Sequence, residues 1–269
     1  MLDKVASDGL VLLGCGKMGT ALLMGWLAAG VPPTSVWVIE PNPTDWLESV
    51  GVHLNTALPK SPAVALVAVK PQMMGAALPA LQALGNGTTL FVSIAAGTPI
   101  AAFAAALGEN TPIVRTMPNT PAMVGRGITG ICGNPQAGAK GLALARDLML
   151  AVGEVVELQG EHQIDAVTAV SGSGPAYVFH LIEALAAAGV AEGLPEAIAM
   201  QLARATVCGS GELAHRSRET AAQLRINVTS PAGTTAAALA HLMDPDTGLQ
   251  PLMRRAVHAA AERGRELAK

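Results

Sequence analysis

The stretch Leu10-Val-Leu-Leu-Gly-Cys-Gly-Lys-Met-Gly19 decides how the first half of this chain is expected to fold. Its apolar opening is typical of a short buried strand, and the glycines after it have the spacing Gly-x-Gly-x-x-Gly. Residues Lys17–Ala29 then have helical spacing and stop at Gly30, with Pro32-Pro33 beyond. A glycine past the end and prolines after it form a helix stop signal. The stretch therefore predicts a strand, a tight turn and a helix.

This context favours a dinucleotide-binding turn over a glycine-rich turn of some other α/β fold, which is the alternative. Gly14 would allow the tight turn, Gly16 would let a pyrophosphate approach the backbone, and Gly19 would let the helix pack close to the strand. Lys17 and Met18 open the helix, whose first N–H groups and positive dipole end would face the phosphates.

An acidic residue, Glu40, follows the second expected strand, 21 residues after Gly19. A carboxylate there accepts hydrogen bonds from the adenosine ribose and repels a 2′-phosphate, which favours NADH. The Pro41/Pro43 loop and Asn42 are able to turn the Glu40 side chain away from the ribose. An arginine beside Glu40 would indicate NADPH, but the sequence has none there. Both NADPH and NADH therefore stay open as cofactors.

Three further strand ends are expected at the carboxyl edge of the sheet, where ligands bind in open α/β folds. Ordinary structural turns are the alternative at each of them. Together the first two favour a cofactor-lining role for Val69, Lys70 and Pro71 and for Ala95, Ala96 and Gly97. At the third, a cofactor-lining role for Asn119 and Pro121 and a purely structural turn stay equally open.

Strands and helices alternate up to about residue 157, and the later part of the chain has only helical patterns. Such alternation indicates a mainly parallel, doubly wound sheet, here assigned to residues 1–160, followed by an all-helical domain over residues 161–269. The break at Ser171-Gly-Ser-Gly-Pro175 is expected to be sharp. The expected strands are Leu10–Leu13, Ser35–Ile39, Val64–Val69, Thr89–Ile94, Pro112–Arg115, Ile128–Cys132 and Val155–Leu158. The expected later helices are Gln163–Val170, Pro175–Ala188, Pro195–His215, Glu219–Asn227, Pro231–Met243 and Gly248–Leu267.

Composition excludes several classes of function. The net charge is −3 and there is no basic run, which argues against a nucleic-acid partner. No signal peptide or uninterrupted membrane-spanning stretch is recognisable, so a cytoplasmic protein without a membrane partner is expected. The three widely spaced cysteines and the unpaired histidines predict no metal site. Only 14% of the residues are charged, so some helix faces are expected to lie against another subunit.

Five further stretches occur in a fixed order along the chain, and with the glycine motif they closely resemble pyrroline-5-carboxylate reductases. They are Val69-Lys-Pro-Gln72, Ser93-Ile-Ala-Ala-Gly97, Arg115-Thr-Met-Pro-Asn-Thr-Pro-Ala122, Asp165-Ala-Val-Thr-Ala-Val-Ser-Gly-Ser-Gly-Pro-Ala176 and Val228-Thr-Ser-Pro-Ala-Gly-Thr-Thr235. The resemblance implies a Rossmann-like domain followed by a helical dimerisation domain. It also implies reduction of a small cyclic imino acid, L-1-pyrroline-5-carboxylate, to L-proline by NAD(P)H. The family's helical domains interlock as homodimers, which often assemble into rings.

The resemblance also implies a substrate site. In Val228–Thr235, Ser230 is expected to cap a helix that starts at Pro231, so that free N–H groups bind the substrate carboxylate. The family places Thr235 near the imine nitrogen as the catalytic hydroxyl, and it places Ser230, Gly233, Thr234 and Glu219 at the substrate. Asn55 is the nearest candidate for an asparagine that contacts the cofactor in the family. This chain has Ala232 where the family usually has glycine, which the first turn of a helix is expected to tolerate.

Two other functions stay open at this point. A β-hydroxyacid dehydrogenase has the same architecture, but it carries a catalytic lysine at the start of its helical domain, and Asp165–Pro175 contains none. A dinucleotide-sensing protein without catalysis would not need the Val228–Thr235 segment.

Overall fold

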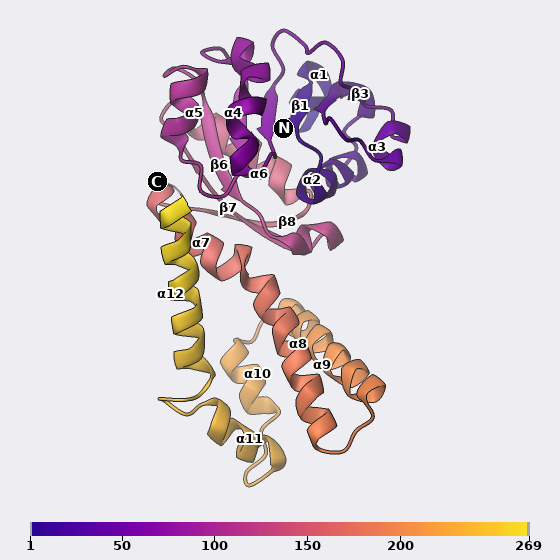
Figure 1. Cartoon of the computed structure of the whole chain (residues 1–269), viewed down its shortest axis with the longest axis vertical. Helices are drawn as coiled ribbons and strands as arrows, with labels where there is room; N and C mark the ends of the chain where they lie inside the picture. The colour runs from indigo at the N-terminus through magenta and orange to yellow at the C-terminus, as the bar shows by residue number, and fades with distance from the viewer. Residues whose placement is uncertain (1, 268–269) are drawn as a thin grey trace. The chain divides into compact units, whose positions relative to one another are not determined.

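The computed structural model describes residues 2–267 of the chain, and they form two compact units. Among these residues, the sheet unit comprises 2–172 and 260–267, and the helical unit comprises Ser173–Ala259. Figure 1 shows the elements of each unit.

The sheet unit is built around one mainly parallel sheet, which confirms the expected doubly wound fold. Among the described residues it has eight strands in the order β3-β2-β1-β4-β5-β6-β7-β8. Neighbouring strands are parallel except β6 and β7, which are antiparallel. The strands are β1 (Leu10–Leu13), β2 (Val36–Ile39), β3 (His53–Leu54), β4 (Val64–Val67), β5 (Leu90–Ser93), β6 (Ile113–Met117), β7 (Gly127–Gly133) and β8 (Gly153–Glu157).

Helices cover both faces of this sheet, so its central strands are buried on two sides. Leu10 and Leu12 of β1 belong to one core, and Val11 and Leu13 belong to the other. This is why β1 is a continuous apolar run rather than an alternating one. The first core also receives α1 (Leu2–Asp8), α2 (Lys17–Ala28) and α6 (Gly138–Leu150), and the second receives α4 (Met74–Ala77), the turns of Leu78–Leu84 and α5 (Ile100–Leu107).

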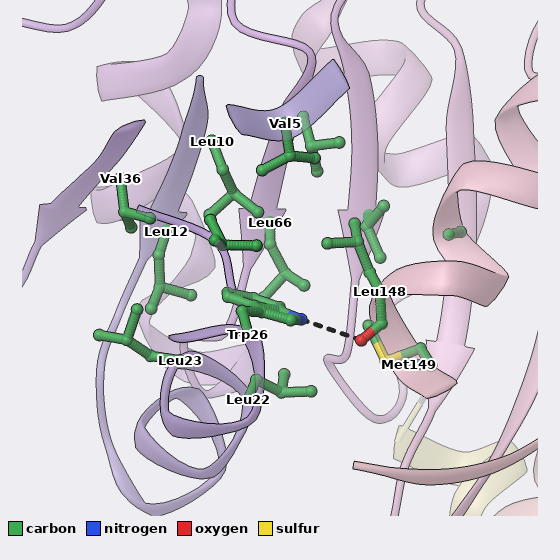
Figure 2. Packing of buried hydrophobic residues seen from close by; sticks show 14 of the residues in the cluster. Val5, Leu10, Leu12, Leu22, Leu23, Trp26, Val36, Leu66, Leu148 and Met149 are labelled. Atoms are coloured by element: carbon green, nitrogen blue, oxygen red, sulfur yellow. Dashed lines mark hydrogen bonds between the residues drawn. The ribbon is translucent and has the colours of Figure 1, made fainter. Parts of the chain in front are cut away.

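One buried tryptophan joins two of the helices in the first core. Trp26 of α2 is fully buried, and its Nε1 donates a hydrogen bond of 2.9 Å to the carbonyl of Leu148 in α6 (Figure 2). The indole therefore buries a large apolar surface without leaving its only donor unpaired. Because α2 begins at the glycine-rich turn, this contact helps to hold that turn in place.

The segment Glu161–Gly172 packs on the sheet, so the two units divide at Gly172–Ser173 rather than at the expected residues 160 and 161. It contains a 3-10 turn (η5, Glu161–Gln163), a short helix (α7, Ile164–Val167) and a π-helical turn (η6, Thr168–Gly172). Ile164 is fully buried, and α7 contacts β6 and β7. The expected sharp break at 171–175 is wrong, because only the bent residue Ser173 separates this π-helical turn from α8.

The helical unit exposes most of its apolar side chains in the single chain. Within Ser173–Ala259, all of which the structure describes, the buried apolar side chains are the methyl groups of Ala186, Ala199 and Ala203. Phe179, for comparison, is 60% exposed. Its helices, among which α8 and α9 pack side by side (Figure 1), are α8 (Gly174–Ala191), α9 (Glu196–Arg216), α10 (Ala221–Asn227), α11 (Thr234–Leu242) and most of α12 (Leu249–Leu267).

Candidate cofactor and substrate sites

The glycine-rich turn between β1 and α2 shows a separate steric reason for each glycine. Gly14 has a φ of +88°, and a Cβ there would lie 2.9 Å from the Cγ1 of Val69. A Cβ on Gly19 would lie 2.6 Å from the carbonyl oxygen of Gly14, because α2 starts directly against the turn. A Cβ on Gly16 would meet no atom within 4 Å. Two glycines are therefore required by the protein's own packing, whereas the third leaves open space.

That open space lies at the start of α2 and at the switch point of the sheet. Gly16 is the N-cap and offers no side-chain cap, so the first N–H groups of α2 are available to an anion. Lys17 is exposed in the first turn, and Met18 beside it is half-buried. β1 lies between β2 and β4, and the chain crosses from one side of it to the other after β3. Ligands of doubly wound folds bind at such switch points.

Glu40 follows β2, and its carboxylate faces the glycine-rich turn. Its Oε2 accepts a hydrogen bond of 2.8 Å from the backbone N–H of Cys15, and its Oε1 accepts one of 3.0 Å from the N–H of Asn42. The Pro41/Pro43 loop therefore does not turn the side chain away.

Asn55 fixes the backbone of Glu40. Its Oδ1 accepts a hydrogen bond of 3.0 Å from the N–H of Glu40, and its Nδ2 donates one of 2.9 Å to the carbonyl. Asn55 itself has a φ of +52°, a conformation that asparagine tolerates better than most residues. Asn55, which the sequence predicts at the cofactor, therefore hydrogen-bonds to the backbone of Glu40.

The residues after β4 begin a new helical turn at the same edge. β4 ends at Val67, and the half-buried Val69 packs against Gly14. Lys70 is the exposed N-cap of a 3-10 turn that starts at Pro71. A proline suits that first position because its missing N–H has no acceptor there.

The residues after β5 approach the end of the chain. Ala95 is buried, and Ala96 and Gly97 are half-buried. Gly97 has a φ of +71°, and a Cβ there would lie 3.2 Å from the carbonyl oxygen of Leu267 in α12. Gly97 is therefore needed for the close approach of α12, a reason that the strand-end pattern did not reveal.

The turn after β6 is tied to the start of β7 by one buried amide. The Oδ1 of Asn119 accepts a hydrogen bond of 2.9 Å from the N–H of Ile128. Asn119 is the N-cap of a 3-10 turn, Thr120–Val124, in which Pro121 is half-buried. The Oδ1 of Asn119 therefore stabilises the turn between β6 and β7.

A buried ion pair below this edge was missed by sequence reasoning. Arg115 of β6 is 4% exposed, and its Nη1 lies 2.8 Å from the Oε1 of Glu161. The same carboxylate oxygen accepts a hydrogen bond from the N–H of Ile100, the first residue of α5. The Nε and Nη2 of Arg115 have no partner among the described residues. A buried arginine requires a carboxylate, but no spacing rule finds one 46 residues away.

The structure offers neither a nucleophilic thiol nor a metal cluster in the sheet unit. Burial raises the pKa of the Cys15 thiol, and burial together with Glu161 raises the pKa of Cys132 to about 11. Both thiols are therefore protonated near neutral pH. No group of three or more histidine, cysteine or acidic side chains able to hold a metal occurs within residues 2–267.

The substrate segment of the helical unit corrects the expected helix start. α10 ends at Asn227 and α11 begins at Thr234, so the helix expected from Pro231 with Ser230 as its cap is wrong. The N–H of Gly233 instead donates a hydrogen bond of 3.1 Å to the carbonyl of Ser230, which closes a turn. Pro231 and Ala232 are the central residues of this turn.

Ala232 explains why the helix cannot start earlier. Its φ of +56° is left-handed, as at the third residue of a type II turn, where glycine is favoured. The expectation that Ala232 lies in a tolerant first helical turn is therefore wrong. Gly233 becomes the N-cap of α11, and the hydroxyl of Ser230 lies where a Cβ on Gly233 would sit.

The resulting helix start presents two threonines. Thr234 and Thr235 are the first residues of α11, Thr234 exposed and Thr235 half-buried. N–H groups in a first helical turn have no acceptor within the helix, so both are free to bind an anion.

Glu219 lies in the same unit and connects to this segment through Asn227. Its Oε2 accepts a hydrogen bond of 3.0 Å from the Nδ2 of Asn227, the residue that precedes Val228. Thr220 caps α10 by accepting a hydrogen bond from the N–H of Gln223. Glu219 is thus linked to the end of α10, and it makes no hydrogen bond to Thr235 within the described residues of the helical unit.

We expect alanine at Gly14 to affect mainly the stability of the protein, and alanine at Gly16 to affect mainly its affinity for the dinucleotide. Gly14→Ala should lower the free energy of unfolding by about 2 kcal/mol, because of its left-handed φ and the contact with Val69. Gly16→Ala should change it by only about 0.5 kcal/mol, yet raise the dinucleotide dissociation constant about tenfold or more, because its methyl group would occupy the pyrophosphate's path. Chemical unfolding and fluorescence titration measure the two quantities. Unchanged dinucleotide affinity in Gly16→Ala would remove the turn from the binding site.

We expect Ala232→Gly to stabilise the protein by about 1 kcal/mol, because it relieves a left-handed alanine. Ala237→Gly, in the exposed middle of α11, is the matched control and should destabilise by about 1 kcal/mol. Thermal unfolding of both variants checks the pair. Equal destabilisation by the two changes would contradict the left-handed turn.

Comparison with known proteins gives a consistent picture over the whole chain. A family model described as pyrroline-5-carboxylate reductase dimerisation matches residues 161–267, and one described as NADP oxidoreductase, coenzyme F420-dependent, matches residues 10–97. Pyrroline-5-carboxylate reductases from Pseudomonas aeruginosa and Synechocystis are 39% and 41% identical, over 98% and 97% of this chain and 98% of their own lengths.

Solved structures agree with these matches. The structure of a pyrroline-5-carboxylate reductase from Coxiella burnetii has a TM-score of 0.90 at 33% identity, covering 98% of this chain and 99% of that chain. One from Plasmodium falciparum, with NADP bound, has a TM-score of 0.83 at 29% identity with the same coverage. Together with the motifs and the sheet order, these similarities show that the chain belongs to the pyrroline-5-carboxylate reductase family.

Proposed function

We propose that the open glycine-rich turn holds the dinucleotide and that the start of α11 holds the substrate carboxylate. As a member of its family, the chain reduces L-1-pyrroline-5-carboxylate to L-proline with NAD(P)H. The observation that carries our assignment of the substrate segment is the start of α11, where a left-handed turn delays the helix until Thr234.

The dinucleotide fits the residues at the carboxyl edge of the sheet unit. The space beside Gly16 accommodates a pyrophosphate, and the first N–H groups of α2 with the Lys17 ammonium supply positive charge. Val69, Lys70, Pro71, Ala95 and Ala96 belong to loops at the same edge and would line the remaining dinucleotide. The Oδ1 of Asn119 already accepts a hydrogen bond from the N–H of Ile128. Asn119 would therefore contact the dinucleotide through its side-chain NH2 group, or it would act by positioning Pro121.

The substrate is a cyclic imine that carries a carboxylate. The reduced nicotinamide supplies a hydride to the imine carbon, and the nitrogen gains a proton. The protein therefore needs to hold the carboxylate, orient the ring and allow the proton to reach the nitrogen. We assign the carboxylate to the N–H groups of Thr234 and Thr235, since the N–H of Gly233 is already bonded to Ser230.

We assign the Thr235 hydroxyl to the imine nitrogen. An unperturbed hydroxyl is a poor acid, so it would orient the ring and relay a proton that comes from water. Ser230 and Gly233 would act by shaping the turn before α11. Glu219 would act at the substrate indirectly, through its hydrogen bond to Asn227.

The match to a dimerisation domain and the exposed apolar helices support a homo-oligomer. We propose further that the dimers assemble into a ring and that the enzyme is cytoplasmic. The stretch Glu161–Ala191 is long and apolar enough to cross a membrane by length and composition. Because all of it lies in the dimerisation match, we assign its exposed apolar side chains to a second copy of the chain rather than to lipid.

Turnover on the purified protein tests the proposed function directly. We expect oxidation of reduced nicotinamide, followed by its absorbance, only when L-1-pyrroline-5-carboxylate is present, with L-proline formed in equal amount. A folded protein that binds dinucleotide but oxidises neither NADH nor NADPH would favour dinucleotide sensing instead.

We expect Thr235→Ala to lower kcat at least about tenfold, because the imine nitrogen loses its hydroxyl partner. The dissociation constant for the dinucleotide should stay within about twofold, since Thr235 is assigned to the substrate. Thr235→Ser retains the hydroxyl and should recover most of the activity, whereas Thr235→Val, of similar shape, should not. Equal kcat values in the valine and serine variants would show that the hydroxyl has no role.

A further inference from the structure

We propose that the adenosine end of the dinucleotide site is built for a free 2′-hydroxyl, so that this chain uses NADH in preference to NADPH. Glu40 is the residue that we assign to this choice. The inference rests on the dinucleotide part of the proposed function and goes beyond it by naming the cofactor.

The carboxylate of Glu40 is placed to accept hydrogen bonds from a ribose. It sits at the end of β2 and touches the glycine-rich turn through the N–H of Cys15. Each of its oxygens accepts one hydrogen bond within the protein, and a carboxylate oxygen has a second lone pair available. A 2′-hydroxyl can donate to that lone pair. A 2′-phosphate dianion has no proton to donate and would bring two negative charges against a third.

The negative charge of Glu40 is held where it is. Turning the side chain away would break the hydrogen bonds from Cys15 and Asn42, which are charge-assisted and therefore strong. Moving the backbone instead would break both hydrogen bonds to Asn55. A 2′-phosphate therefore finds no easy rearrangement that removes the repulsion.

The surrounding segment does not supply the positive charge that a phosphate needs. Between Val36 and Lys60 the chain carries Glu40, Asp45 and Glu48, and Lys60 is its only lysine or arginine. His53 is stacked on Trp37 with ring centroids 4.5 Å apart, and its Nε2 is 2.9 Å from the carbonyl of Thr34. Arginine and lysine are the usual partners of a 2′-phosphate, so the residues here do not fit one.

This conclusion differs from what the comparisons alone would suggest. The family model over residues 10–97 is described as an NADP oxidoreductase, and the structure from Plasmodium falciparum contains NADP. The residues of this chain fit the nicotinamide dinucleotide as far as the pyrophosphate, and they disagree with NADP only at the adenosine 2′ position.

Binding measured without turnover tests the proposal. We expect fluorescence titration of the intact protein to give a dissociation constant for NADH at least about tenfold lower than that for NADPH. In competition against bound NADH, 5′-AMP should displace it at lower concentration than 2′,5′-ADP, because the second compound carries the additional 2′-phosphate. Equal or tighter binding of NADPH would overturn the inference, and so would equal competition by the two nucleotides.

Variants separate the charge of Glu40 from its contact with the turn. Glu40→Gln retains an oxygen for the N–H of Cys15 but removes the charge, so the preference for NADH should fall at least about fivefold. Glu109→Gln is the matched control, since Glu109 is exposed and precedes β6, at the edge of the sheet opposite to the glycine-rich turn. It should leave the ratio unchanged. An unchanged ratio in Glu40→Gln would remove Glu40 as its cause.

The two proposals fail in different ways. If neither dinucleotide binds to folded protein, the proposed function itself is wrong. If both bind with similar affinity and L-1-pyrroline-5-carboxylate is still reduced, only the choice of NADH is wrong. Should Glu40→Gln fail to fold, the wild-type affinities and the competition by 5′-AMP and 2′,5′-ADP still decide the question.

Discussion

Close contact between the glycine-rich turn and the neighbouring strand end is the constraint on which the sheet unit depends. Gly14 packs against Val69 after β4, and Gly19 packs against the carbonyl of Gly14. These contacts bring α2 down onto the switch point and leave the space beside Gly16 open. Trp26, one helix length away, anchors the other end of α2 to α6. The proposed dinucleotide site is therefore the open space beside Gly16, between backbone segments that are closely packed at Gly14 and Gly19.

The same edge of the sheet is held by polar side chains that act on the backbone. Glu40 bonds to the turn, Asn55 bonds to Glu40, and Asn119 bonds to the start of β7. Glu161 neutralises the buried Arg115 and caps α5 with the same oxygen. Each of these groups is charged or strongly polar, and all except the exposed Asn55 are partly or wholly buried. The buried groups therefore require their partners. This supporting network makes the loop ends rigid enough to present a ligand site.

The helical unit shows the opposite balance. A chain segment that buries only three alanine methyl groups cannot be stabilised by its own core, and its exposed leucine, valine and phenylalanine side chains need a partner. The dimerisation match over residues 161–267 supports a second copy of this chain as that partner. Low charge along these helices, visible in the composition, and apolar exposure in the folded chain thus have one cause.

Much of this organisation is present in the sequence. Local patterns predict the strands other than the two-residue β3, the stop of α2 and the glycine turn, because each depends on residues a few positions apart. The expected β1 and α2 agree with the structure to within one residue. The start of α11 was misplaced because Pro231 suits a helix start and a turn equally well. Only the φ of Ala232 distinguishes the two. The pairing of Glu40 with Cys15 and Asn55, of Arg115 with Glu161, and of Gly97 with Leu267 was decided by the tertiary structure alone. These partners are far apart along the chain, and only the folded backbone brings them within hydrogen-bonding or van der Waals distance.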